Sequence, residues 1–225
     1  MNQVKKAGNR QGCRPQINTG DRRYRQVLEA LFCDGVKMSV EKSFDVINTL
    51  NESGILSVVV GGIVVGCYSG RPRATQDLDI IVSERPNLPT LKRIGKIVGA
   101  KKMEKHPSFI SFIVSSVVGD REIVDLITSR AGSYGLALEN TKRIIVNGIA
   151  ISIPTIEMMI VLKYTSAVNP IREKAKQMQD WADIYSIIDA HPGISQGSLE
   201  RLANCVVPGY GDDLKRKVKS HLLGL

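Results

Sequence analysis

The chain combines short apolar runs with longer segments in which apolar residues recur every three or four positions. Short runs bounded by turn-forming residues are typical of buried strands, whereas the longer spacing is typical of helices that bury one face. The runs come mainly in the first two thirds of the chain, and the helical spacing continues alone after them. The sequence therefore predicts an α/β (α+β) fold, with a mixed, twisted sheet followed by a helical C-terminal region.

The first half of the chain is predicted to hold two leading helices, a strand–helix–strand unit and one further helix. The second leading helix places Val40, Phe44 and Ile47 on one apolar face, and Gly54 lies near its end. In chain order the predicted bounds are Arg22–Phe32, Val40–Asn51, Ser57–Val60, Gly62–Tyr68, Leu78–Ser83 and Leu88–Val98.

The second half is predicted to hold two hairpins and then helices. A tight turn at Gly119-Asp120 would join the strands of the first hairpin, and Asn147-Gly148, a dipeptide favoured in two-residue turns, would join those of the second. After Pro154 the spacing is helical. The hairpin strands are predicted at Ile110–Val118, Glu122–Ile127, Arg143–Val146 and Ala150–Ile153, and the helices at Ile156–Ala167, Arg172–Ile188, Leu199–Val206 and Asp213–Leu223.

Positive charge is concentrated at the N-terminus. The 225 residues carry a formal net charge of +9. Residues 1–25 contain seven basic residues against Asp21, which gives +6, and the remaining 24 basic and 21 acidic residues give only +3. We therefore expect a disordered basic tail at 1–21 that attracts RNA electrostatically or merely aids solubility, and a folded body that is not itself strongly basic.

Several classes of protein are not expected from the composition. No apolar run approaches the roughly 18 residues that a membrane-spanning helix needs, and the basic N-terminus is not followed by the apolar segment of a secretory signal. Cys13, Cys33, Cys67 and Cys205 form no C-x-x-C pair, and the chain has three histidines. A zinc site or a disulfide framework is therefore not expected, and the predicted location is the reducing cytoplasm.

Two short motifs carry candidate chemistry. An apolar strand runs into Gly61-Gly62, where backbone N–H groups free of Cβ atoms can approach a phosphate closely. Fourteen residues later, strand alternation places Asp77 and Asp79 on one face, about 6 to 7 Å apart, where they repel each other unless a cation lies between them. Each motif alone is also found in ordinary turns and solvated strand edges, but together they predict a phosphate site beside Mg²⁺.

These residues resemble the nucleotidyltransferase superfamily that includes DNA polymerase beta, and within it the AbiE-type toxin-like and minimal nucleotidyltransferase branches. The resemblance extends from about Val58 to Asp183 and rests on Gly61-Gly62 and on the segment from Arg73 to Asp79. It implies that the glycine pair opens a short helix, that the D-x-D pair holds two metal ions, and that a third carboxylate lies on a neighbouring strand. The gap between the glycines and the first aspartate is longer than the commonest spacing in the superfamily, a departure that affects the turn after the short helix.

The resemblance gives Asp125 the role of the third carboxylate. An ionised side chain within the apolar segment Ile123–Ile127 is costly unless it has a partner, and a bound metal would provide one. In the superfamily this carboxylate helps to deprotonate the attacking hydroxyl. The alternatives are an edge strand with one solvated face, or a salt bridge to Arg121 or Arg143.

Three further side chains are candidates for nucleotide binding. Lys163, in an apolar helix, suits the β or γ phosphate, although it could equally extend along the helix into solvent. Arg73 and Thr75 could hold phosphate oxygens, or Arg73 could simply neutralise the aspartates. Secondary candidates on the helix that follows are Arg172, Lys174, Lys176, Asp180 and Asp183.

The resemblance implies three regions: the basic tail at 1–21, a nucleotidyltransferase core at 22–153 and a helical region at 154–225. The expected activity is transfer of an NMP from an NTP to an acceptor hydroxyl, with two Mg²⁺ ions on Asp77, Asp79 and Asp125. The preferred acceptor is RNA, for example a tRNA end, and a toxin of this kind would have an antitoxin partner. The alternatives are an antibiotic-like small molecule or a protein side chain as acceptor, or a nucleotide-binding module without turnover.

Overall fold

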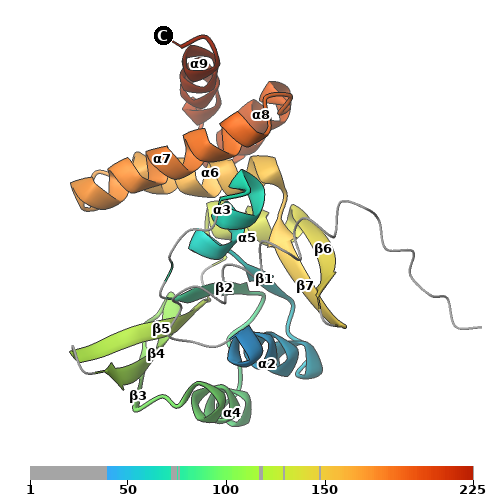
Figure 1. Cartoon of the computed structure of the whole chain (residues 1–225), viewed down its shortest axis with the longest axis vertical. Helices are drawn as coiled ribbons and strands as arrows, with labels where there is room; N and C mark the ends of the chain where they lie inside the picture. Colours follow the sequence, from blue (N-terminus) through green and yellow to red (C-terminus); the bar gives the residue numbers. More distant parts are fainter. Residues whose placement is uncertain are drawn as a thin grey trace, which may run out of the picture.

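The structure is a computed structural model, and it describes residues 40–71, 75, 77–116, 119–128, 130–146 and 148–224. The predicted tail, the predicted helix Arg22–Phe32 and the candidate Arg73 lie outside these residues. The described part contains a mixed five-stranded sheet, a two-stranded sheet and helices on both sides of the larger sheet (Figure 1). The predicted α/β class is confirmed.

The five-stranded sheet brings together strands that are distant in the sequence. β1 and β2 are antiparallel, β2 and β5 are parallel, and β5, β4 and β3 form an antiparallel meander. The parallel pair is central, so the residues of β2 and β5 can share one site. In sheet order the strands are β1 (Ser57–Val59), β2 (Leu78–Val82), β5 (Gly119–Ile127), β4 (Phe109–Ser116) and β3 (Lys102–Lys105).

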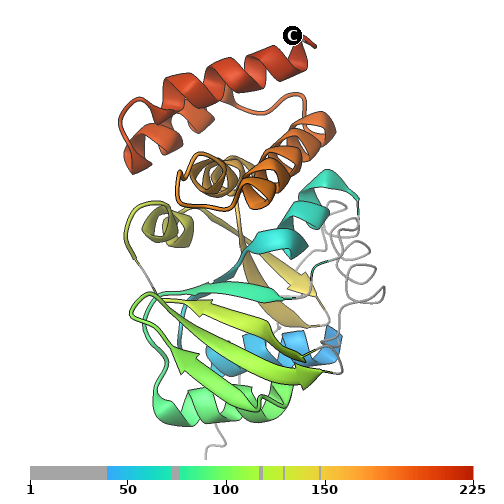
Figure 2. The same ribbon diagram turned by 90° about the vertical axis from the view of Figure 1, so that its left-hand side faces the viewer.

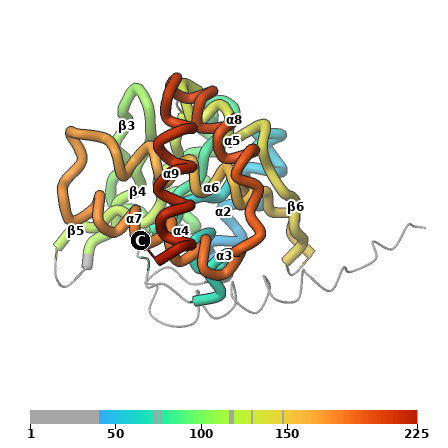
Figure 3. Tube along the Cα trace, turned by 90° about the horizontal axis from the view of Figure 1, so that it is seen from above, coloured from blue at the N-terminus to red at the C-terminus, as the bar shows by residue number. Residues whose placement is uncertain are grey.

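The helices form layers on the two sides of this sheet. One side carries α2 (Val40–Glu52) and α4 (Leu88–Val98), and the other carries α3 (Gly61–Ser69) and α5 (Ser133–Glu139) below the C-terminal helices (Figures 1 and 2). Seen from above, α9 lies over α6 (Figure 3). The C-terminal helices are α6 (Ile156–Ala167), α7 (Lys174–Ala190), α8 (Gln196–Val206) and α9 (Tyr210–Leu222).

The second hairpin is present as predicted. β6 (Thr141–Val146) pairs antiparallel with β7 (Ile149–Pro154) and forms a separate two-stranded sheet. Gly148 in its turn has φ +78°, a conformation that favours glycine. The hairpin lies beside β1 and leads directly into α6 (Figure 1).

One continuous apolar core joins the sheet to the helices on both sides. Ile80 at the centre of β2 is fully buried, as are Val46 of α2, Ile160 of α6 and Ile187 of α7. Full burial of such a side chain contributes about 1.5 to 3 kcal/mol relative to exposure. The C-terminal helices and the sheet therefore share one buried core.

Four features differ from the sequence-based predictions. Gly119 and Asp120 are not a turn, because they pair with Ser116 and Ser115 as the start of β5. The edge strand β3 was not predicted since its residues are charged and mostly exposed, and the short helix α5 lacks a long apolar period. The ends of α7, α8 and α9 differ from the predicted bounds by up to three residues. None of the described helices is both long and apolar enough to cross a membrane.

Candidate active site

A cavity of about 440 Å³ lies between the sheet and the C-terminal helices. Its walls come from the end of β1, the start of α3, the strands β2 and β5, and the helices α5, α6 and α7. Every described residue that we predicted from the sequence as a primary site residue lines this one cavity. They are Gly61, Gly62, Thr75, Asp77, Asp79, Asp125 and Lys163.

The glycine pair opens a helix, as predicted. α3 begins at Gly61, whose φ is +74°, and the preceding Val60 provides no side-chain cap for the first turn. The backbone N–H of Val60 donates to the carbonyl oxygen of Asp79 at 2.9 Å, which ties this turn to β2. The N–H groups at the start of α3 therefore lie beside the carboxylates, in the arrangement that suits a bound phosphate.

The predicted carboxylates come together through strand pairing. Asp79 and Asp125 are direct partners in the parallel β2–β5 register, and neighbouring strands are about 4.8 Å apart. Asp77 precedes β2 by one residue and lines the same cavity. Its Oδ1 accepts a hydrogen bond from the Thr75 hydroxyl at 2.8 Å, so Thr75 orients a carboxylate.

Asp125 lies in an environment that disfavours its charge. Burial raises the pKa of its carboxyl group, a hydrogen bond donated by the Ser111 hydroxyl opposes this, and the charge of Asp77 raises the pKa further. Within the described residues Asp125 forms no salt bridge to Arg121 or Arg143, the two partners that were left open. No cationic side chain of the described residues is therefore paired with this carboxylate at the cavity.

A fourth carboxylate, Glu122, was missed by the sequence analysis. The register of β4 and β5 shifts by one residue, so that Val124 and Glu122 face successive residues of β4 and Ile123 is extra. Such a β-bulge re-aims the side chains on one side of it. Glu122 consequently lines the same cavity as Asp125, although simple alternation would place the two on opposite faces. No residue pattern in the sequence marks a bulge of this kind.

The pKa values of Glu122 and Tyr134 are both raised at this cavity. Burial raises the pKa of Glu122, and the charges of Asp125, Glu104 and Asp77 add to the effect while Lys176 opposes it. Burial also raises the pKa of the Tyr134 hydroxyl in α5. The cavity is therefore a concentration of carboxylates that a bound cation would stabilise.

Lys163 is part of a buried ion-pair network in the wall of the cavity. Its Nζ lies 2.9 Å from Asp180 Oδ1 and 2.8 Å from Asp183 Oδ2. Arg172 Nε lies 2.7 Å from the other oxygen of Asp180. The side chains of Asp180 and Asp183 are only 2% and 3% exposed, and that of Lys163 is 12% exposed. Lys163 thus points into the protein and not along the helix into solvent, which had been the alternative.

The secondary candidates divide into two groups. Arg172, Lys176 and Asp180 line the cavity, whereas Lys174 and Asp183 are not among its lining residues. Lys176 is exposed and forms no salt bridge with another described residue. Its ammonium group could therefore pair with a phosphate without first breaking a salt bridge to a described residue.

The carboxylates fit a divalent cation by their chemistry. Asp77, Asp79 and Asp125 supply hard oxygen ligands at the wall of one cavity, and the pKa of Asp125 is raised by burial and, to a smaller extent, by the charge of Asp77. Mg²⁺ prefers such oxygens together with substrate phosphates. Over the part of the chain that the structure describes, no three Asp, Glu, His or Cys side chains already converge as a metal-ligand group.

Comparison with known proteins identifies the family. Residues 39–189 match the model of a family described as nucleotidyl transferase of unknown function (DUF2204). No curated protein matches the chain.

Solved structures with a similar fold include an antigenic nucleotidyltransferase-like protein from Paracoccidioides brasiliensis, at 16% identity and a TM-score of 0.47, covering 89% of this chain and 98% of that one. The antibiotic-resistance factor ANT(2'')-Ia has 13% identity and a TM-score of 0.47, covering 82% and 98%. The CCA-adding enzyme of Thermotoga maritima has 14% identity and a TM-score of 0.35, covering 86% and 55%.

Proposed function

The chain belongs to the nucleotidyl transferase family DUF2204, and on that premise we propose that it transfers an NMP from an NTP to an acceptor hydroxyl in a Mg²⁺-dependent reaction. The observation that carries this proposal is the meeting of three elements at one cavity. The start of α3 at Gly61 lies against Asp79, and Asp79 is the strand partner of Asp125. A phosphate site and carboxylate oxygens are thus adjacent, as transfer from a triphosphate requires.

The backbone at the start of α3 would hold the triphosphate. The N–H groups of Gly61 and Gly62 provide donors without Cβ atoms, and the helix N-terminus favours negative charge. Lys176, which lines the same cavity from α7, could pair with the same phosphates. Arg73 keeps the nucleotide-binding role predicted from the sequence, and it lies outside the described residues.

The reaction would proceed by direct displacement. The acceptor oxygen forms a bond to the α-phosphorus, the bond from that phosphorus to the oxygen bridging to the β-phosphate breaks, and pyrophosphate leaves with the electron pair. The hydroxyl proton would pass to Asp125, the carboxylate that lies opposite Asp79 in the strand register at the cavity. Asp77, Asp79 and Asp125 would hold two Mg²⁺ ions, which supply charge neutralisation at the phosphates.

Lys163 has a role that can be argued from its contacts. Its ammonium group is shared by Asp180 and Asp183, and Arg172 lies beside Asp180, so two cations balance the two buried carboxylates in the cavity wall. We propose that Lys163 fixes the shape of this wall and prevents the two carboxylates from adding negative potential at the nucleotide site. The division of the chain into a core at 22–153 and a helical region at 154–225 is likewise part of the proposal, with the cavity between them.

For the acceptor we propose RNA, with a tRNA end as the first candidate. The support is the excess of positive charge in residues 1–25, which would attract a polyanion. On this proposal the protein could act as a toxin that modifies RNA and is held inactive by an antitoxin. A small hydroxylated molecule or a protein side chain as acceptor would instead make transfer insensitive to salt and to loss of residues 1–25.

Purified full-length protein, incubated with each α-labelled NTP, Mg²⁺ and total RNA, tests the proposal. We expect label in RNA from a subset of the NTPs, loss of transfer with EDTA, and loss with Asp79→Asn. Parallel reactions with a panel of antibiotics, and with protein in place of RNA, test the other acceptors. Binding of NTP with no label in any acceptor would make the protein a nucleotide-binding module without turnover.

A further inference from the structure

Positive charge in the folded body is not spread evenly. Residues 91–106 contain six basic side chains against Glu104, a net of +5. The whole chain after residue 25 carries only +3, so the rest of the folded body is slightly acidic. Two short segments carry much of the positive charge: residues 215–219, with four basic residues and no acidic one, and the longer segment at residues 91–106. The basic residues of the longer segment are Lys92, Arg93, Lys96, Lys101, Lys102 and Lys105.

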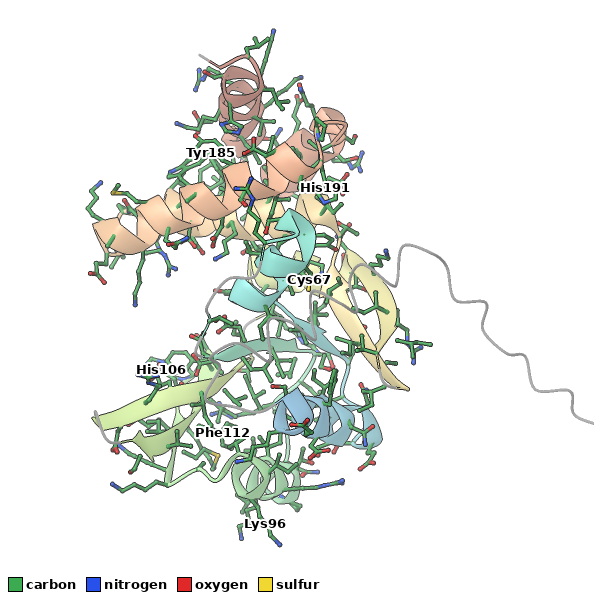
Figure 4. All side chains as sticks on the ribbon, viewed as in Figure 1. Cys67, Lys96, His106, Phe112, Tyr185 and His191 are labelled. Atoms are coloured by element: carbon green, nitrogen blue, oxygen red, sulfur yellow. The ribbon has the colours of Figure 1, made fainter. Side chains whose placement is uncertain are left out.

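The fold gathers most of this charge around one groove. A second cavity, of about 490 Å³, lies between the C-terminal half of α4, β3 and the adjoining β4. Four of its ten lining residues are lysines, and none is acidic. It lies at the end of the molecule opposite the C-terminal helices, where Lys96 is labelled in Figure 4. We call the four lysines, Lys92, Lys96, Lys101 and Lys102, the basic edge.

The lysines of the basic edge are accessible to a ligand. Lys92 and Lys96 are exposed, lie one helical turn apart on α4, and have no ion-pair partner among the described residues. Lys101 lies 3.7 Å from Asp120 and Lys102 lies 2.5 Å from Glu104. All four side chains of these two ion pairs are about half exposed or more, so the pairs are weak. Each lysine can therefore exchange its carboxylate partner for a phosphate.

The register of the sheet connects the basic edge to the catalytic carboxylates. Asp125 of β5 is opposite Ser111 of β4, and Ser111 is opposite Glu104 of β3, so these three residues share one face. Lys102, two residues from Glu104, lies on that face as well. The edge strand is two strand spacings, or about 10 Å, from β5. Lys92 and Lys96 lie on the other side of the sheet, where Phe112 packs against Gly95 of α4, so a polyanion on the basic edge would cross the edge strand β3 at Lys102 to reach the face of Asp125.

We propose that the basic edge binds the phosphate backbone of the RNA acceptor and directs its end toward the cavity at Asp125. This inference rests on the proposed function, since it assumes that the acceptor is RNA. An acidic protein is the less suitable occupant, because protein interfaces are depleted in lysine and depend on exposed aromatic or aliphatic anchors. In this groove the large apolar residues Leu91 and Phe112 are buried, and what is exposed is lysine.

Two double variants of the full chain test the proposal, Lys92→Gln/Lys96→Gln and Lys101→Gln/Lys102→Gln. Binding of labelled tRNA is measured over a salt series. Each phosphate contact that is lost removes about 0.7 to 0.9 from the slope of log affinity against log salt, so each double variant is expected to lower the slope by about one to two. The matched control is Arg143→Gln/Lys219→Gln, which removes the same charge from exposed positions on β6 and α9.

The expected result is a weaker, less salt-dependent interaction with tRNA in both test variants and an unchanged one in the control. NTP binding and the rate of transfer at saturating tRNA should stay at the wild-type level. An equal loss in the control, or wild-type binding in the test variants, would overturn the proposal while leaving the transferase activity intact. Loss of poly-glutamate binding with tRNA binding unchanged would assign the edge to an acidic protein and would also overturn it. If the wild-type chain transfers label only to a small molecule, the RNA acceptor itself is wrong.

Discussion

A Cβ atom added to Gly61 would lie 2.0 Å from Oδ2 of Asp79. The turn that opens α3 and the carboxylate of Asp79 in β2 are thus in such close contact that only glycine, which has no Cβ, fits at position 61. Gly61 also has φ +74°, which strains any other residue. The proposed phosphate site and the proposed metal ligand Asp79 are therefore in direct contact, and a larger side chain at position 61 must displace Asp79.

Gly61→Ala is expected to lose transfer activity together with stability. The left-handed backbone costs about 1 to 2 kcal/mol for alanine, and the clash moves Asp79 out of place. Gly70→Ala is the matched control, because Gly70 has φ +66° and nothing within 4 Å of an added Cβ. Thermal unfolding should show a loss of stability in both variants, whereas steady-state kinetics should show a large loss of activity only in Gly61→Ala.

Asp77→Asn and Asp79→Asn should each keep the fold and lose transfer by at least about 100-fold, which corresponds to a few kcal/mol of transition-state stabilisation. Each change removes a ligand charge and nearly preserves shape. Turnover is measured with labelled NTP, and Mg²⁺ binding by calorimetry. Glu139→Gln, an exposed carboxylate on α5, is the control. Wild-type turnover in either aspartate variant would show that the two-metal assignment is wrong.

Asp125→Asn is expected to stabilise the metal-free protein at neutral pH. Because burial raises the pKa of Asp125 above its ordinary value of 3.8, the native state binds more protons than the unfolded state between these two values. The free energy of unfolding of the wild-type protein therefore falls as the pH rises through this window, and the penalty persists above it. Asparagine carries no such penalty.

The measurement is thermal unfolding in EDTA from pH 3 to pH 8. The advantage of Asp125→Asn over wild type should be greatest at neutral pH and should vanish below the ordinary pKa of the carboxyl group. Asp120→Asn, an exposed position on the same strand, should follow the wild-type profile. An Asp125→Asn curve parallel to wild type over the whole range would contradict the role of burial and of Asp77 in the pKa of Asp125.

The parts of the site that depend on local pattern could be predicted from the sequence. Gly61-Gly62 after an apolar strand and the alternation through Asp77 and Asp79 each follow from backbone geometry within a few residues. Most helices and strands were likewise predicted to within a few residues, because their apolar periods are regular. Asp125 could be singled out since it is the one charged residue within the apolar segment Ile123–Ile127.

The parts that depend on pairing between distant segments could not be predicted. Glu122 reaches the cavity through a one-residue register shift, and Lys163 meets Asp180 and Asp183 only when α6 packs on α7. The basic edge likewise forms only when β3 lies beside α4. Because β3 is charged and mostly exposed, its sequence shows no apolar alternation that would predict a strand. Such contacts are set by tertiary packing, which residue spacing does not encode.

Lys163→Gln is expected to reduce the free energy of unfolding by about 3 to 5 kcal/mol, because it removes the cation that two buried carboxylates share, although Asp180 keeps its contact with Arg172. Asp180 and Asp183 cannot reach water to recover this loss, as their side chains are only 2% and 3% exposed. The change is measured by denaturant unfolding. Lys215→Gln is the control: its pair with Glu200 at 2.7 Å is partly exposed, so about 1 kcal/mol or less should be lost.

The double variant Lys163→Gln/Asp183→Asn then separates the two roles of Lys163. Removing one carboxylate charge together with the cation should recover part of the lost stability, since less negative charge is left buried. If Lys163 also acts on the nucleotide, NTP affinity should remain weak in the double variant although the fold is restored. Full recovery of NTP binding and turnover would instead limit Lys163 to the support of the cavity wall.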